Sequence, residues 1–340
     1  MIVELRSDTF TRPTPEMRAV MAAADVGDDV WGEDPTARAL EERAAEILGK
    51  ERAVFVPSGT MANQIALLVH CRPGDEVIVG RGAHNRAFES GAGAAWAGVQ
   101  FAEVGELDGT FSAADVAAAT LPVDRNLPHT RLVCVENTHN RGGGRVWPKA
   151  QVAAVAGAAR ERSLGLHLDG ARIWNAAIAL GLPERELAAP FDTVGACFSK
   201  GLGAPVGSVF AGPRDAVDSA RRFRKMLGGG MRQAGILCAA ALYALERHRA
   251  RLADDHANAR RLADGLAAIP GITAWPARVE TNIVIFEVTP IPARELSARL
   301  AAAGVRIAPI APNRLRAVTH LDVDAAGIDR TLAAVRAALV

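Results

Sequence analysis

Short apolar segments alternate with helical segments over the first two-thirds of the chain, and this alternation limits the possible folds more than any other feature. The segments of strand length are 53–56, 76–79, 132–136, 164–168, 193–198 and 207–210. A helical stretch at 38–48 opens with Asp34 and Pro35, a capping residue followed by proline in the first turn. Its apolar face consists of Leu40, Ala44, Ile47 and Leu48. Strands that alternate with such helices predict an α/β fold, in which a mostly parallel sheet has helices on both sides.

The pattern changes after about residue 245, where charged and amphipathic segments replace the regular alternation. The expected elements there are a long helix, a strand, a second helix, a second strand and a terminal helix, the first four at 246–268, 282–288, 293–303 and 314–319. We therefore predict two domains: residues 1–245 form an N-terminal segment and a large domain, and residues 246–340 form a smaller α+β domain.

Composition excludes several classes of protein. The 340 residues carry a net charge of +1, with 49% hydrophobic and 23% charged residues, which is typical of a globular protein and offers no basic surface for nucleic acid. No apolar run approaches the roughly 20 residues that a membrane span needs. The N-terminal MIVELRSD has no apolar core of a secretory signal, and the four cysteines lack metal-site or disulfide spacing. We expect a cytoplasmic protein that binds no nucleic acid, membrane or metal.

The first candidate site residues are Ser58, Gly59 and Thr60, which follow the strand AVFV and open a helix. Free backbone N–H groups and the positive helix end would bind a phosphate there. The alternative is that Ser-Gly-Thr simply caps the helix.

The second candidate is Asp169 in LHLDGAR. The leucines at alternate positions point to one face of the strand, so His167 and Asp169 share the other, and Asp169 emerges at the strand end. Alternatively, Asp169 caps the next helix and pairs with Arg172.

The third candidate is Lys200, in the sequence ACFSKGLGAP. Glycines and Pro205 indicate a shaped turn, and the apolar flanks are expected to lower the pKa of the amine. A neutral lysine amine is what a Schiff base requires. The alternative is a surface lysine in a mobile loop.

Together the three features predict pyridoxal 5′-phosphate as cofactor, because it needs an anion site, an amine for its aldehyde and a carboxylate against its ring nitrogen. The order of phosphate loop, Asp169 and Lys200 supplies all three from successive strand ends.

The chain resembles the low-specificity L-threonine aldolases, a family of fold-type I pyridoxal-phosphate enzymes related to the aromatic amino acid β-eliminating lyases. The matching segments run almost from end to end: LRSDT (5–9), VGDDVWGEDPT (26–36), PSGTMAN (57–63), AHNRAFE (83–89), ENTHN (136–140), HLDGAR (167–172), SKGLGAPVGS (199–208), GGGMRQ (228–233) and RAVTHLD (316–322). The resemblance implies a three-layer αβα, aspartate aminotransferase-like large domain.

The resemblance also implies residue roles. Lys200 would hold the cofactor through an imine, Asp169 would pair with its ring nitrogen, and Gly59 and Thr60 would bind its phosphate. His84 would stack on its ring and approach the substrate hydroxyl as the base. The remaining positions contact the cofactor oxygen or the substrate carboxylate: Ser7, Arg172 and Arg316.

The activity implied is cleavage of L-threonine, L-allo-threonine or another β-hydroxy-α-amino acid such as phenylserine to glycine and an aldehyde. The family implies a homotetramer, a dimer of dimers, in which the GGGMRQ segment, with Lys225 and Arg232, completes a neighbouring subunit's site. Other fold-type I lyases or transferases, and a non-catalytic protein of this fold, remain alternatives. The chain departs from the family pattern at Trp31 and Ser90, and His129 is a candidate for a substrate-side histidine.

Overall fold

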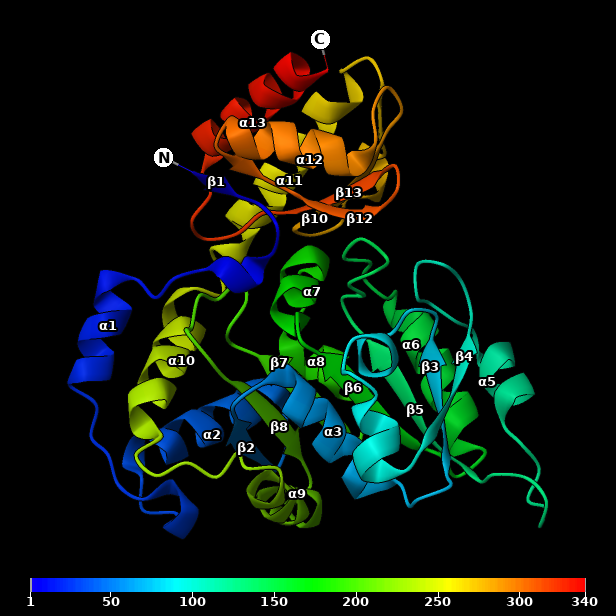
Figure 1. Cartoon of the computed structure of the whole chain (residues 1–340). Helices are drawn as coiled ribbons and strands as arrows, with labels where there is room; N and C mark the ends of the chain where they lie inside the picture. Colours follow the sequence, from blue (N-terminus) through cyan, green and yellow to red (C-terminus); the bar gives the residue numbers. More distant parts are fainter. Residues whose placement is uncertain (1, 340) are drawn as a thin grey trace.

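A mostly parallel sheet forms the centre of the larger part of the molecule. The computed structural model describes residues 2–339, with the large part below and the small part above in Figure 1. The strands lie in the order β2 (Arg52–Val56), β8 (Ser208–Gly212), β7 (Thr193–Cys197), β6 (Gly165–Gly170), β5 (Thr130–Glu136), β3 (Glu76–Gly80) and β4 (Gln100–Val104). Among these strands β8 alone runs in the direction opposite to the other six, so the predicted mostly parallel sheet is confirmed.

Helices cover both faces of this sheet because its strands are apolar on both sides. Val54 and Val56 of β2 pack with helices α3 (Gly59–His70) and α9 (Arg214–Met226). The alternate residues of β2 face a larger group, made of α2 (Pro35–Leu48), α5 (Ala113–Ala119), α6 (Lys149–Arg160), α7 (Ile173–Leu180), α8 (Glu184–Ala188) and α10 (Gly235–Arg247). Helix α1 (Pro15–Ala22) lies against α10.

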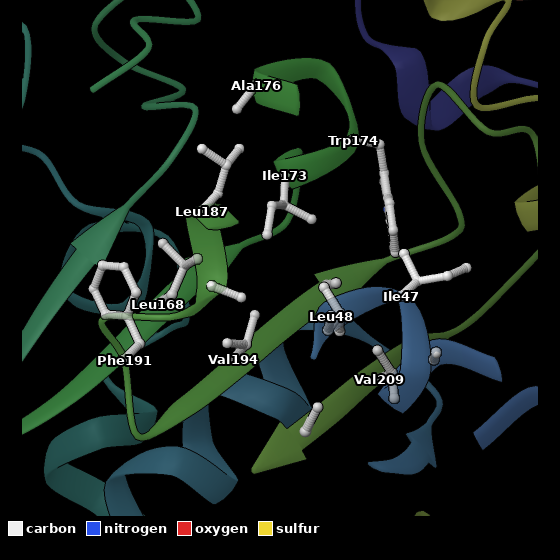
Figure 2. Packing of buried hydrophobic residues seen from close by; sticks show 14 of the residues in the cluster. Ile47, Leu48, Leu168, Ile173, Trp174, Ala176, Leu187, Phe191, Val194 and Val209 are labelled. Carbon is white, nitrogen blue, oxygen red and sulfur yellow. The ribbon is translucent and has the colours of Figure 1, made fainter. Parts of the chain in front are cut away.

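Figure 2 shows part of the larger of these two core regions and illustrates how the strands and helices pack. Leu168 and Val194 of adjacent strands lie near Ile173 and Leu187, and all four are buried. In α2, the predicted apolar face is buried as expected. The Asp34 side chain caps this helix by accepting a hydrogen bond from the Ala37 amide at 2.8 Å.

The small part is built on an antiparallel sheet with its own apolar core. Its strands lie in the order β12 (Ala308–Ala311), β13 (Arg314–Val318), β10 (Ile283–Val288) and β9 (Ile272–Ala274). It also contains α11 (Leu252–Ala267), α12 (Ala293–Ala302) and α13 (Ala325–Ala338), drawn from yellow to red in Figure 1. Within residues 2–339, no helix combines the length and the apolar character that crossing a membrane requires.

The chain start belongs to this small part. Strand β1 (Val3–Glu4) pairs in parallel with β11 (Val305–Arg306), and Leu5 is buried in the small core. The expected domain 1–245 had included these residues, because a pairing over 300 positions leaves no local signal in the sequence. The expected helix 246–268 also differs: α10 ends at Arg247 and α11 begins at Leu252.

The remaining elements are short. They are η1 (Asp8–Phe10), η2 (Asp29–Trp31), α4 (His84–Ala87), the π-helical turn η3 (Gly93–Ala97) and η4 (Pro276–Arg278). Of these, η1 and α4 lie at the site described next.

Candidate active site

The carboxyl ends of β2, β3, β5, β6 and β7 meet at one edge of the large sheet, facing the small part. A cavity of about 600 Å³ lies there, where open α/β sheets commonly bind ligands. It is lined by all nine residues expected from the sequence: Ser7, Ser58, Gly59, Thr60, His84, Asp169, Arg172, Lys200 and Arg316.

The expected phosphate site is the first turn of α3. The Ser58 hydroxyl caps the helix by accepting a hydrogen bond from the Met61 amide at 3.1 Å. The amides of Gly59 and Thr60 are the first two of the helix and have no acceptor within it. A Cβ on Gly59 would lie 2.7 Å from the Cys197 Sγ, so glycine keeps this approach open. Capping and anion binding, which the sequence offered as alternatives, are therefore compatible here.

Asp169 is buried at the end of β6. Its Oδ2 accepts a hydrogen bond from Asn63 Nδ2 at 2.8 Å, and its Oδ1 accepts one from the Ala171 amide at 3.1 Å. Burial alone would raise the pKa of Asp169, but the positive charges of His84 and Lys200 and these hydrogen bonds lower it. A charged carboxylate is therefore held inside the cavity, ready to pair with a cation.

Arg172 does not pair with Asp169, so that alternative for Asp169 is wrong. Its Nε and Nη2 donate to the two oxygens of Asp8 at 2.7 and 2.8 Å, and both side chains are buried. Asn282 Nδ2 also donates to Asp8, at 3.2 Å. Despite burial, the charge of Arg172 and these hydrogen bonds lower the pKa of Asp8. Arg172 thus joins the chain start to the large sheet.

Lys200 lies in the turn that follows β7. Thr11 Oγ1 and the Gly203 amide both donate to its carbonyl oxygen, at 2.9 and 2.8 Å, and Gly203 has a φ of +81°. The side chain is half-buried. Its charge contributes to lowering the pKa of both Asp8 and Asp169. The apolar flanks Phe198 and Leu202 are buried, and the carboxylates of Asp8 and Asp169 are close enough to interact with the amine.

His84 begins α4 and is held by a buried carboxylate. Its Nδ1 lies 2.9 Å from Glu89 Oε1, which also accepts a hydrogen bond from Asn63 Nδ2 at 2.8 Å. Burial alone would lower the pKa of His84, but the bond to Glu89 and the charges of Asp169, Glu89 and Glu136 raise it. Since Nδ1–H donates to Glu89, Nε2 is the basic nitrogen of the neutral ring.

Glu136 fixes the backbone around His84. Its Oε2 accepts a hydrogen bond from the His84 amide and its Oε1 one from the Asn140 amide, both at 2.8 Å. The roles of Asp8, Asn63 and Glu136 were not expected from the sequence, although all three stand inside the motifs that carry the resemblance. Their chemistry depends on partners that are distant in the chain.

Arg316 lies on β13 and reaches the cavity from the small part. Its Nη1 donates to Asn140 Oδ1 at 3.0 Å, while its buried Nε has no partner among the described residues. Burial and the neighbouring Arg172 lower the pKa of Arg316. The charge of Asp8 partly opposes this lowering, but Arg316 forms no ion pair of its own within residues 2–339.

Several further candidates do not line this cavity. Trp31 and Lys225 line a separate hollow of about 470 Å³, and Arg232 pairs with Asp28 at 3.1 Å. His129 directly precedes the amino end of β5 and is not among the residues that line this cavity. Within residues 2–339, no group of three or more metal-binding side chains was found.

Known proteins share both the sequence and the architecture. The Beta-eliminating lyase family matches residues 4–289. The probable low-specificity L-threonine aldolase 2 of Arabidopsis thaliana is 46% identical over 337 residues, which cover 97% of this chain and 95% of the relative. The low specificity L-threonine aldolase of Escherichia coli O157:H7 is 46% identical over 325 residues, which cover 95% of each chain.

Solved structures extend the comparison to the fold. The Leishmania major threonine aldolase has a TM-score of 0.86 at 22% identity, covering 99% of this chain and 100% of that one. A structure of SPT with PLP has a TM-score of 0.77 at 17% identity, covering 99% of this chain and 87% of that one. The expected fold-type I architecture is thereby confirmed. This chain belongs to the β-eliminating lyase family and, within it, to the threonine aldolases.

Proposed function

We propose that this protein cleaves L-threonine, L-allo-threonine and related β-hydroxy-α-amino acids, such as phenylserine, to glycine and an aldehyde, with pyridoxal 5′-phosphate as cofactor. The observation that carries the proposal is the meeting of Lys200, Asp169 and the first turn of α3 in one cavity with His84 and Arg316.

The residues present fit this cofactor. The free amides of Gly59 and Thr60 suit its phosphate, Asp169 suits a protonated ring nitrogen, and the Lys200 amine suits its aldehyde. The Gly59 position supports the fit, because any Cβ there would displace the neighbouring thiol. When bound, the cofactor supplies a sink for the electron pair left on Cα as the Cα–Cβ bond breaks.

Arg316 binds the substrate carboxylate. Of the Arg172 and Arg316 guanidinium groups in the cavity, that of Arg172 already has both oxygens of Asp8, whereas the buried Nε of Arg316 has no partner among the described residues. A carboxylate at Arg316 would supply the missing acceptor and the missing countercharge. Arg172, expected to contact cofactor or substrate, acts in this proposal mainly by positioning Asp8 and Ser7.

His84 takes the proton of the substrate hydroxyl at Nε2. The hydrogen bond from Nδ1 to Glu89 fixes the ring orientation and the tautomer, and it makes the ring a stronger base. Because Asn63 donates to both Glu89 and Asp169, one amide sets the distance between the base and the carboxylate.

We also propose a homotetrameric, cytoplasmic enzyme whose sites are shared between subunits. Lys225 and Trp31 line a surface hollow away from the cavity of their own chain, which supports a role in a neighbouring subunit. The division near residue 245 is supported by the separate core of the small part, to which we add β1.

The test is a substrate panel resolved at Cβ, with the protein loaded with pyridoxal 5′-phosphate. We expect glycine and aldehyde in equal amounts, and Lys200→Ala should lower this rate by at least about a thousandfold and remove the visible absorption of the bound cofactor. Lys149→Ala, at an exposed residue paired with Glu186, is the matched control. Ammonia and a keto acid in place of glycine and aldehyde would instead indicate a β-eliminating lyase.

A further inference from the structure

The mouth of the cavity carries a guanidinium group that the proposed reaction does not use. Arg141 lies in the turn after β5, and its exposed side chain lines the cavity together with Phe88, Ile310 and Arg314. All four residues are exposed, whereas Asp169 in the same cavity is buried.

Arg141 differs from Arg172 and Arg314, which also line the cavity, because it has no ion-pair partner among the described residues. Arg172 is paired with Asp8 at 2.7 Å, and Arg314 with Glu287 at 2.7 Å. Arg141 makes no ion pair or hydrogen bond with any residue in the part of the chain that the structure describes. The acidic groups of the cavity do not serve it, since both oxygens of Glu136 accept backbone N–H groups.

Arg141 and the catalytic histidine have one aromatic ring, that of Phe88, as a common neighbour. The rings of His84 and Phe88 have centroids 5.8 Å apart, and the Arg141 guanidinium carbon lies 5.4 Å from the Phe88 centroid. Burial, Arg172 and also Arg141 lower the pKa of Arg316. Two positive groups that form no ion pair within residues 2–339, Arg141 and Arg316, thus line the same cavity.

We propose that this site accepts β-hydroxy-α-amino acids with a second carboxylate, and that Arg141 binds it. The inference rests on the proposed function: with the α-carboxylate at Arg316 and the hydroxyl at His84, the other substituent of Cβ extends toward Phe88 and Arg141. A substrate with one carboxylate can supply an ion-pair partner to only one of the two guanidinium groups, whereas a dicarboxylic substrate can supply a partner to both. The simplest such substrate is 3-hydroxyaspartate.

The reaction is the same bond cleavage and needs no further reactant. The Cα–Cβ bond of 3-hydroxyaspartate breaks, the hydroxyl proton passes to His84, and the hydroxyl oxygen becomes the aldehyde oxygen of glyoxylate. Cα gains a proton and leaves as glycine, so atoms and electrons balance without an oxidant or a reductant.

The test compares L-threonine with 3-hydroxyaspartate in three proteins. Glycine release from L-threonine and from the two L-3-hydroxyaspartate diastereomers is measured in the loaded wild type, Arg141→Gln and Arg314→Gln. Arg141→Gln should lower kcat/KM for 3-hydroxyaspartate by about tenfold, since a charge-assisted hydrogen bond is lost. Values for threonine should change by less than about twofold, as for an ordinary surface substitution.

Arg314→Gln is the matched control, because Arg314 lines the same mouth but is paired with Glu287. It should leave the ratio of the two kcat/KM values unchanged. Binding supplies a second readout: by calorimetry, L-aspartate should bind the wild type more tightly than L-2-aminobutyrate, and Arg141→Gln should remove the difference. High salt should also reduce this difference in affinity, because Arg141 is exposed and its charge is screened.

The outcomes separate this inference from the proposed function. Cleavage of threonine with an unchanged substrate ratio in Arg141→Gln would overturn the role of Arg141. An equal loss for both substrates would also overturn it, by assigning Arg141 to general attraction of amino acids. A wild type that releases glycine from neither substrate would overturn the proposed function itself.

Discussion

The inner and outer sides of the cavity differ in how their charges are compensated. On the inner side, Asp169, Asn63, Glu89 and His84 form a continuous set of hydrogen bonds, which we call the inner network. On the outer side, Arg316 and Arg141, the outer arginines, lack acidic partners among residues 2–339.

This difference separates two tasks. The inner network is complete without a ligand, so its groups are held in one geometry before anything binds. The outer arginines gain ion-pair partners only when a ligand binds. Their positive charge therefore favours binding of anionic groups and destabilises the protein without a ligand. The following substitutions test this contrast.

Asp169→Asn should have the largest effect, because it removes the negative charge of the inner network while nearly preserving its shape. We expect kcat for threonine cleavage to fall by about 100- to 1000-fold, since the carboxylate no longer favours a protonated cofactor ring. Steady-state kinetics at saturating cofactor measure this fall in kcat. Asp218→Asn, at an exposed residue, is the control. A fall below about tenfold would show that this charge is not essential.

Arg316→Met should raise KM for threonine by about 30-fold or more, with a smaller change in kcat, because the carboxylate loses its charged partner. The same variant should be more stable when free of cofactor. The lowered pKa of Arg316 means that folding disfavours its charged form, so an apolar side chain removes that cost and should raise Tm by about 2 °C. A lower Tm would show that the Asn140 contact outweighs the missing countercharge.

Glu89→Gln should change the pH dependence more than the maximal rate. As a base, His84 acts in its neutral form, so activity rises as pH increases through its pKa. Glu89 helps to raise this pKa, so its loss should move the rise to lower pH and lower the maximal rate by about tenfold. Profiles of kcat/KM against pH measure the shift, and an unchanged profile would assign the rise to another group.

Much of the fold could be predicted because apolar strands and capped helices are local features. β2, β5 and β6 appear as apolar runs, and Asp34 marks the start of α2. Edge strand β4 was not expected, because QFAEV is only partly buried and mixes polar with apolar residues. The break after Arg247 was also missed, since the amphipathic pattern continues across it.

The candidate site, like the fold, was predictable only in its local features. Each site residue could be located because it follows a strand end inside a motif, but its partner could not. Whether Arg172 pairs with Asp169, three residues away, or with Asp8, 164 positions away, depends on the tertiary structure. For the same reason, Glu89 could be identified as a motif residue but not as the partner of His84.

The pairing of β1 with β11 constrains the order in which parts of the structure can form during translation. Val3 meets Val305, and the Val318 amide donates to the Leu5 carbonyl oxygen. Asp8, the partner of Arg172, follows directly along the chain. Residues 3–8 must therefore wait until residues 305–318 have been made, so the large sheet can form early while the cavity is completed only after β11 and β13 have left the ribosome.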